Sequence, residues 1–188
     1  MKIQDSGMPD ETIWSRFFDP YKILLQMEFT PDLKSVVDLG CGFGTFSIPA
    51  SQMTNGKIHA FDIDPEMIGQ LQIKINQQAI KNIDLHLTDF IAEGSGFEDN
   101  SIDYVMLFNI LHHYNPHQIF HEVYRILKPN AKVGIIHWRS DIPTPRGPQL
   151  DIRPKPEQCK QWAAETGFAV LSEILIEPYH FGILIAKS

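Results

Sequence analysis

The chain has 188 residues, of which 43% are hydrophobic and 21% are charged, and its formal net charge is −7. These proportions are typical of a folded globular domain and exclude an intrinsically disordered chain. The negative net charge disfavours DNA or RNA as a partner, because proteins that bind a phosphate backbone normally carry an excess of positive charge.

Neither the N-terminus nor any internal segment predicts contact with a membrane. The first ten residues include Asp5, Pro9 and Asp10, where a signal peptide would have a basic start and an apolar run. No segment approaches the roughly 18 uninterrupted apolar residues of a membrane span. Cys41 and Cys159 are far apart, and neither has a close partner for a metal or redox pair. We therefore expect a cytoplasmic protein with reduced thiols, whose oligomeric state the sequence leaves open.

The first predicted element is a helix over residues 11–29 that is rich in aromatic side chains, and we expect it to pack on the domain or to cover the site. From residue 34 onward, short apolar runs alternate with longer amphipathic stretches, a pattern typical of parallel strands joined by helices. Strands are expected at 34–39, 57–62, 83–87, 102–108 and 132–138, and helices at 45–53, 65–79 and 116–127.

The last third of the chain begins with a predicted loop. Residues 139–156 contain five prolines, too many for a regular element, so this segment is either an ordered or a flexible loop, and we leave open whether it acts as a lid. A short helix at 157–166 follows, and two strands at 168–176 and 180–186 close the sheet. We expect one domain over residues 31–188, with residues 1–30 as a helical extension packed on it.

The most informative segment is a turn with three glycines at alternate positions. In the sequence VVDLGCGFGTF, at residues 36–46, an apolar strand runs directly into Gly40, Gly42 and Gly44. Glycine has no Cβ, so a ligand can lie against the main chain here. The dinucleotide pattern G-x-G-x-x-G is not met, because position 45 is Thr45. The carboxylate of Asp38 would also repel a pyrophosphate.

The stretch from Asp38 to Gly44 resembles motif I of the class I S-adenosylmethionine-dependent methyltransferases, and the likeness continues to the C-terminus. The segment AFDIDPEM, at 60–67, is similar to the family's second signature, in which the residue at the Asp62 position accepts both ribose hydroxyls. The segment LTDF, at 87–90, resembles the adenine-binding motif. RILKPNAK, at 125–132, resembles a glycine-containing turn of the family, with Asn130 in a position that Asn can occupy in the left-handed region.

This resemblance implies a Rossmann-like, doubly wound α/β fold with a mostly parallel seven-stranded sheet, an antiparallel C-terminal strand and helices on both faces. The implied cofactor is S-adenosylmethionine, with S-adenosylhomocysteine as product, and the overall pattern is similar to the ubiquinone/menaquinone-biosynthesis type of small-molecule methyltransferase. As alternatives, Asp62 could cap the helix near residue 65, and Asp89 could be a solvated loop carboxylate. The implied cofactor-binding residues are Asp38, Gly40, Cys41, Gly42, Gly44, Asp62, Ile63, Asp89, Phe90 and Asn109.

On the acceptor side, methyl transfer needs mainly positioning, and a base only where the acceptor must lose a proton. His112 and His113 follow the fourth strand and are the candidate catalytic residues, the alternative being a structural hydrogen-bonding pair. The spacing of His113, His117 and His121 suggests a metal site, but Asn115-Pro116 keeps the first of them out of the helix, so no metal is expected.

The partner we expect is a small-molecule acceptor. A local excess of basic residues in the proline-rich loop favours an anionic acceptor, the alternative being arginines that bind loop carbonyls. The alternatives to a methyltransferase are a non-catalytic domain that binds S-adenosylmethionine or S-adenosylhomocysteine as a sensor or scaffold, and an NAD-dependent reductase, which Thr45 and Asp38 disfavour. The basic loop residues are Arg139, Arg146, Arg153 and Lys155.

Overall fold

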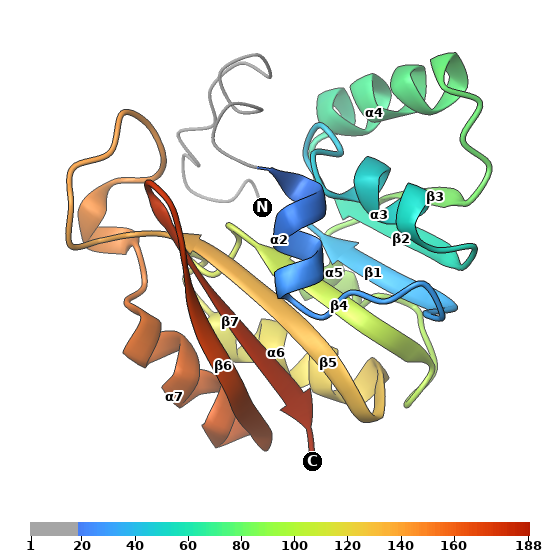
Figure 1. The fold of residues 1–188 in the computed structure, drawn as a ribbon. Coiled ribbons are helices and arrows are strands. Elements are labelled where there is room, and N and C mark those ends of the chain that lie inside the picture. Colours follow the sequence, from blue (N-terminus) through green and yellow to red (C-terminus); the bar gives the residue numbers. More distant parts are fainter. Residues whose placement is uncertain (1–18) are drawn as a thin grey trace.

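The structure is a computed structural model that describes residues 19–188. Seven strands form one sheet in the order β3-β2-β1-β4-β5-β7-β6 (Figure 1). The first five strands run parallel to one another, and β7 runs antiparallel to both β5 and β6. This confirms the predicted doubly wound, mostly parallel sheet with an antiparallel C-terminal strand. The strands are β1 (Ser35–Leu39), β2 (Lys57–Asp62), β3 (Ile83–Leu87), β4 (Ile102–Phe108), β5 (Leu127–Trp138), β6 (Phe168–Ile176) and β7 (His180–Lys187).

Helices cover both faces of this sheet (Figure 1). One face carries α2 (Pro20–Gln26), α3 (Ser47–Met53) and α4 (Pro65–Gln77), whose apolar side chains share one core cluster with the sheet. The other face carries α5 (Phe90–Glu93), α6 (Pro116–Ile126) and α7 (Pro156–Thr166), which share a second cluster with it. A short 3-10 turn, η1 (Leu150–Ile152), lies within the proline-rich segment.

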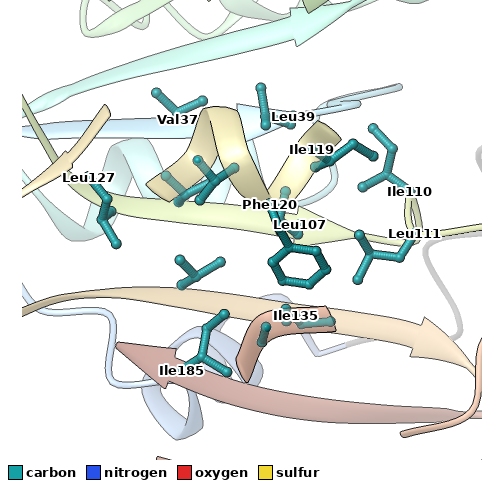
Figure 2. Packing of buried hydrophobic residues seen from close by; sticks show 14 of the residues in the cluster. Val37, Leu39, Leu107, Ile110, Leu111, Ile119, Phe120, Leu127, Ile135 and Ile185 are labelled. Carbon is teal, nitrogen blue, oxygen red and sulfur yellow. The ribbon is translucent and has the colours of Figure 1, made fainter. Parts of the chain in front are cut away.

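An apolar stripe along α6 is the centre of the second cluster. Ile119, Phe120 and Val123 of α6 are fully buried against the sheet, and Figure 2 shows Ile119 and Phe120 packed among strand residues such as Leu107 and Ile135. Burying a side chain of this size stabilises a fold by roughly 1.5–3 kcal/mol. The stripe therefore anchors α6, and with it the loop that connects β4 to α6.

The N-terminal prediction is tested only in part, because residues 11–18 of the expected helix lie outside the described residues. Among the described residues, Pro20–Gln26 form α2, which ends before the predicted end at residue 29, and its Ile23 and Leu24 are buried. The hydroxyl of Tyr104 in β4 donates to the carbonyl of Met27 at 2.8 Å. The C-terminal end of α2 is thereby fixed to the middle of the sheet. The extension over residues 1–30 and the domain over 31–188 stay predictions.

The structure differs from the predictions most clearly in the course of β5 and in one additional short helix. β5 begins at Leu127, five residues before the predicted start, because Leu127 pairs with Ile102 before a register shift. The segment around Pro129, which in sequence resembles a turn of the family, therefore belongs to the strand that follows the end of α6, and Asn130 adopts a left-handed φ of 64°. The four-residue helix α5 was not predicted.

Among residues 19–188, no helix has the length and apolar character to cross a bilayer.

Candidate functional site

The candidate site lies at the point where the order of the strands reverses, between β1 and β4. Ligands of doubly wound sheets bind outside the carboxyl ends of the strands at such a switch point. Leu39 of β1 pairs with Phe61 of β2, and Asp38 pairs with Met106 of β4. The segments that follow these three parallel strands therefore meet at one edge of the sheet.

The glycine turn has the backbone that its sequence predicts. Gly40, Gly42 and Gly44 have φ values of +80°, +51° and +79°, in the region that favours glycine. A Cβ on Gly44 would lie 2.3 Å from Cδ1 of Leu71 in α4, and one on Gly40 would lie 3.0 Å from Cδ1 of Ile110. The missing side chains let the turn approach both α4 and the loop after β4.

The N–H groups of this turn are directed into the protein. The amides of Gly40 and Cys41 both donate to the carbonyl of Phe61, at 2.9 and 2.8 Å. The amide of Gly42 donates to Oδ2 of Asp62 at 2.9 Å. A turn that binds a pyrophosphate directs its N–H groups at the anion instead. The Cys41 side chain is buried, which raises the pKa of its thiol well above the usual range and keeps it neutral.

Asp62 ends β2 and holds the backbone on both sides of the site. Its Oδ1 accepts the N–H of Asp64 at 2.9 Å, while its Oδ2 accepts Gly42. Burial raises the pKa of this carboxyl, and the backbone donors partly offset the effect. Asp64, and not Asp62, caps α4, by accepting the N–H of Glu66. Because each carboxylate oxygen can accept more than one hydrogen bond, Asp62 keeps acceptor capacity for a vicinal diol.

Asp38 is buried at the end of β1, with 3% of its surface exposed. Ser47, in the first turn of α3, donates its hydroxyl to Oδ2 of Asp38. Burial raises the pKa of Asp38 to about 7; the Ser47 hydrogen bond lowers it, and the nearby charge of Asp62 raises it. Sequence reasoning missed Ser47, although a hydroxyl in the first helical turn after the glycines is a recognisable signal.

The raised pKa of Asp38 predicts that this residue makes the fold less stable as the pH rises. The native pKa of about 7 lies above the unfolded value near 4, so the stability that Asp38 contributes is complete below about pH 4 and is lost as the pH approaches 7. Across that pH range, the free energy of unfolding of Asp38→Asn should rise relative to that of the parent by roughly 1.4 kcal/mol per pH unit. Urea denaturation from pH 4 to 8 measures this difference. Asp84→Asn, at an exposed carboxylate, is the control, and parallel curves for Asp38→Asn and the parent would contradict the prediction.

Ile63, Asp89 and Phe90 lie beside Asp62 at the same edge, because Asp62 pairs with Leu87 at the end of β3. Asp89 is the N-cap of α5, and its Oδ1 accepts the N–H of Ala92 at 3.1 Å. The Phe90 side chain is buried in the core, while Ile63 and Asp89 are half-buried. The structure thus brings the three predicted adenine-side residues together next to Asp62.

Asn109, directly after β4, combines a left-handed backbone with a side-chain amide that has no partner among the described residues. It has a φ of +58°, and its N–H donates to the carbonyl of Ile136 at 2.7 Å. Its side-chain Oδ1 and Nδ2 are both buried, and neither has a hydrogen-bond partner among the described residues. Buried polar atoms are nearly always hydrogen-bonded, so an unpaired amide at a switch point indicates a site shaped for a polar ligand.

His112 and His113 follow Asn109 in the same loop and have different surroundings. Nδ1 of His112 lies 3.3 Å from Nε2 of His137 in β5. Nδ1 of His113 accepts the N–H of Asn115 at 3.1 Å. Burial lowers the pKa of both rings, that of His112 to about 4. No sequence signal pointed to His137, which lies within an apolar strand.

The proline-rich segment after β5 is held in place by Arg153. Its guanidinium is buried over the ring of Trp138 and donates to three carbonyls, those of Pro148, Arg139 and Arg146, at 2.7, 2.9 and 3.2 Å. Arg153 therefore does not represent a ligand-binding residue of the loop but the other predicted possibility, an arginine that binds loop carbonyls. Arg139 forms a two-bond pair with Asp141.

Comparison with known proteins agrees with this geometry. The family described as "Methyltransferase domain" matches residues 36–130, more than half of the chain. A methyltransferase-like protein of Schizosaccharomyces pombe is 32% identical over 114 residues, which are 60% of this chain and 41% of that protein. Aklanonic acid methyltransferase of a Streptomyces species is 37% identical over 73 residues, 38% of this chain and 32% of that enzyme.

Demethylmenaquinone methyltransferase of Listeria welshimeri is 29% identical over 106 residues, 54% of this chain and 44% of that enzyme. The chain spans less than half the length of these three curated relatives.

Among solved structures, an S-adenosylmethionine-dependent methyltransferase from Aquifex aeolicus has the same fold, with a TM-score of 0.85, 24% identity, and coverage of 95% of this chain and 94% of that one. A second such enzyme, from Mesorhizobium loti, gives a TM-score of 0.70 at 16% identity, over 88% of this chain and 96% of that one. With its sheet order, its glycine turn and the matched family, the chain belongs to the methyltransferase domain family.

Proposed function

We propose that the chain transfers the methyl group of S-adenosylmethionine to a small-molecule acceptor and releases S-adenosylhomocysteine. One observation carries this proposal: Asp38, the glycine turn, Asp62 and the unpartnered amide of Asn109 converge on the switch point of the sheet. These groups fit the cofactor, which joins a cationic amino acid end to a ribose diol and an adenine. The family supports the reaction class.

Each part of the cofactor has a proposed partner in the site. Asp62 accepts the two ribose hydroxyls, and Ile63, Asp89 and Phe90 hold the adenine. Asp38 faces the amino acid end across the turn formed by Gly40, Cys41, Gly42 and Gly44, and Asn109 supplies the polar atoms that have no other partner among the described residues. When bound, the sulfonium supplies an already activated leaving group. The residues of the chain therefore mainly orient the two reactants.

The geometry of the turn disfavours a dinucleotide. The amides of Gly40, Cys41 and Gly42 are bonded to β2 and are not available to a pyrophosphate. Asp38 and Asp62 add two carboxyl groups to the same edge, and these would repel phosphate oxygens. Both observations support a cofactor without phosphate.

The acceptor side consists of the loops after β4 and β5. Two relatives are named for small-molecule methylation, of aklanonic acid and of demethylmenaquinone, which supports a small molecule here as well. His112 and His113 are the proposed residues that contact the reacting group of the acceptor. Because Arg139 and Arg153 are committed to loop contacts, exposed Arg146 is the residue we propose for an anionic group on the acceptor.

A labelled-methyl transfer screen tests this function. The full chain is incubated with methyl-labelled S-adenosylmethionine and a metabolite extract, and we expect S-adenosylhomocysteine together with label in the low-molecular-mass fraction. Asp62→Ala is the binding-deficient control. Binding of S-adenosylmethionine by calorimetry without transfer to any fraction would instead support the non-catalytic sensor, and label in protein or nucleic acid would refute the small-molecule acceptor.

A further inference from the structure

Two buried histidines connect the loop after β4 with the end of β5. His112 has 5% of its surface exposed and His137 has none. Nδ1 of His112 and Nε2 of His137 are 3.3 Å apart, and the ring planes lie at 68° to each other. This distance allows one hydrogen bond, whose direction depends on which ring nitrogen carries the proton.

The carbonyl of Trp138 determines the direction of the hydrogen bond between His112 and His137. Nδ1 of His137 lies 3.3 Å from this oxygen, which can only accept, so Nδ1 of His137 carries the proton. Burial, with the neighbouring charge of His112 when protonated, lowers the pKa of His137 well below the usual range, so its ring is neutral and its Nε2 is an acceptor. His112 must then donate from Nδ1.

Nε2 of His112 is consequently unprotonated and can only accept a hydrogen bond. Burial lowers the pKa of His112 to about 4, and the neighbouring His113 and Arg153 act in the same direction, so the ring is neutral near neutral pH. Its Nε2 is buried and has no hydrogen-bond partner among the described residues. A buried acceptor without a donor is rare in folded proteins and calls for a ligand or a water to satisfy it.

His113 cannot replace His112 in this role. Its Nδ1 accepts the N–H of Asn115, so the neutral ring carries its proton on Nε2 and offers a donor there. His112 also belongs to the loop that packs on the glycine turn, because the Ile110 side chain would contact a Cβ at Gly40. The acceptor nitrogen therefore comes from the segment that borders the proposed cofactor.

We propose that His137 is a positioning residue that fixes His112 as the Nδ1–H tautomer, so that Nε2 of His112 accepts a hydrogen bond from a hydroxyl or N–H group of the methyl acceptor. The inference rests on the proposed function for the identity of the ligand, but the tautomer itself does not depend on it. The acceptor class is accordingly a compound that presents an O–H or N–H group next to the atom that is methylated.

Nuclear magnetic resonance of the full chain labelled with ¹⁵N in histidine tests the pair, with His112→Gln to assign the signals. Near neutral pH we expect His112 to show a protonated Nδ1 and an unprotonated Nε2. His137→Leu should lose this pattern, and His137→Gln should keep it, because the glutamine carbonyl can accept from Nδ1. A protonated Nε2 in the parent, or an unchanged His112 in His137→Leu, would overturn the inference.

Phenol, as a small hydroxyl donor, tests the acceptor role in the same samples. We expect phenol to shift the Nε2 signal of His112 in the parent and in His137→Gln, and to bind roughly fivefold to tenfold more weakly in His137→Leu, as for the loss of one hydrogen bond. No shift of that signal in the parent would overturn the acceptor role. Calorimetry with S-adenosylmethionine is run alongside, because a failure to bind it would refute the proposed function while leaving the tautomer result unaffected.

Discussion

Asp62→Ala is expected to weaken S-adenosylmethionine binding by roughly 100-fold or more. In the proposed complex the carboxylate accepts both ribose hydroxyls, and a hydrogen bond to a charged group contributes about 1.5–3 kcal/mol, each 1.4 kcal/mol being a factor of ten. The substitution also releases the amides of Gly42 and Asp64, which Asp62 holds at 2.9 Å. Isothermal titration calorimetry measures the affinity directly.

Asp84→Ala is the matched control for this prediction. Asp84 lies on the neighbouring strand β3, and its carboxylate forms an exposed pair with Lys57 at 2.8 Å, away from the carboxyl edge of the sheet. The same change of residue type there should leave the affinity within about twofold, because exposed pairs contribute about 0–1 kcal/mol to stability and nothing to the site. Equal affinities in Asp62→Ala and the parent would show that the ribose does not bind there.

Lys187→Met is expected to lower the free energy of unfolding by about 3 kcal/mol. Lys187 Nζ, near the C-terminus, donates to Oδ1 of Asn100 and to the carbonyls of Tyr124 and Leu127, at 2.7, 2.6 and 2.8 Å. Methionine keeps the aliphatic stem but leaves these oxygens, two at the end of α6 and one in the turn before β4, without their donor, at about 1–3 kcal/mol for each group that stays buried. For a chain of this length, the melting temperature should fall by roughly 6–12 °C.

Chemical denaturation of the parent, Lys187→Met and Lys57→Met separates this effect from the loss of any lysine. Lys57 pairs with Asp84 on the surface, so its replacement should change stability by no more than about 1 kcal/mol. Similar losses in the two variants would show that the three contacts of Lys187 do not stabilise the end of α6.

The strands were the most predictable part of the fold. β2, β3 and β4 have the predicted bounds, because each is a short apolar run between clear breaks in the sequence. β5 was predicted too short, since Lys128-Pro129-Asn130 has the composition of a turn, and only the pairing of Leu127 with Ile102 extends the strand through it. Helix α5 is too short to show a helical period.

The site was predictable where one segment carries its own signal. The glycine turn could be identified from the spacing of its glycines, and Asp62 from the resemblance of residues 60–67 to the family's second signature. The contact of Ser47 with Asp38 and the contact of His137 with His112 could not, since each joins residues of different elements that only the folded sheet brings together. Arg153 shows the opposite case, in which local charge suggested a ligand and the fold directed the side chain to loop carbonyls.

Under the proposed function, the contacts of Arg153 bear on how the preference for a methyl acceptor changes through substitution. The buried guanidinium of Arg153 and the ring of Trp138 hold the segment after β5 in place. The exposed side chains of this segment therefore contribute little to the stability of the fold. Substitutions at exposed residues such as Arg146 can then accumulate without unfolding this segment. In directed evolution, a library confined to those positions should retain mostly folded members, and selection could act on acceptor choice almost independently of foldability.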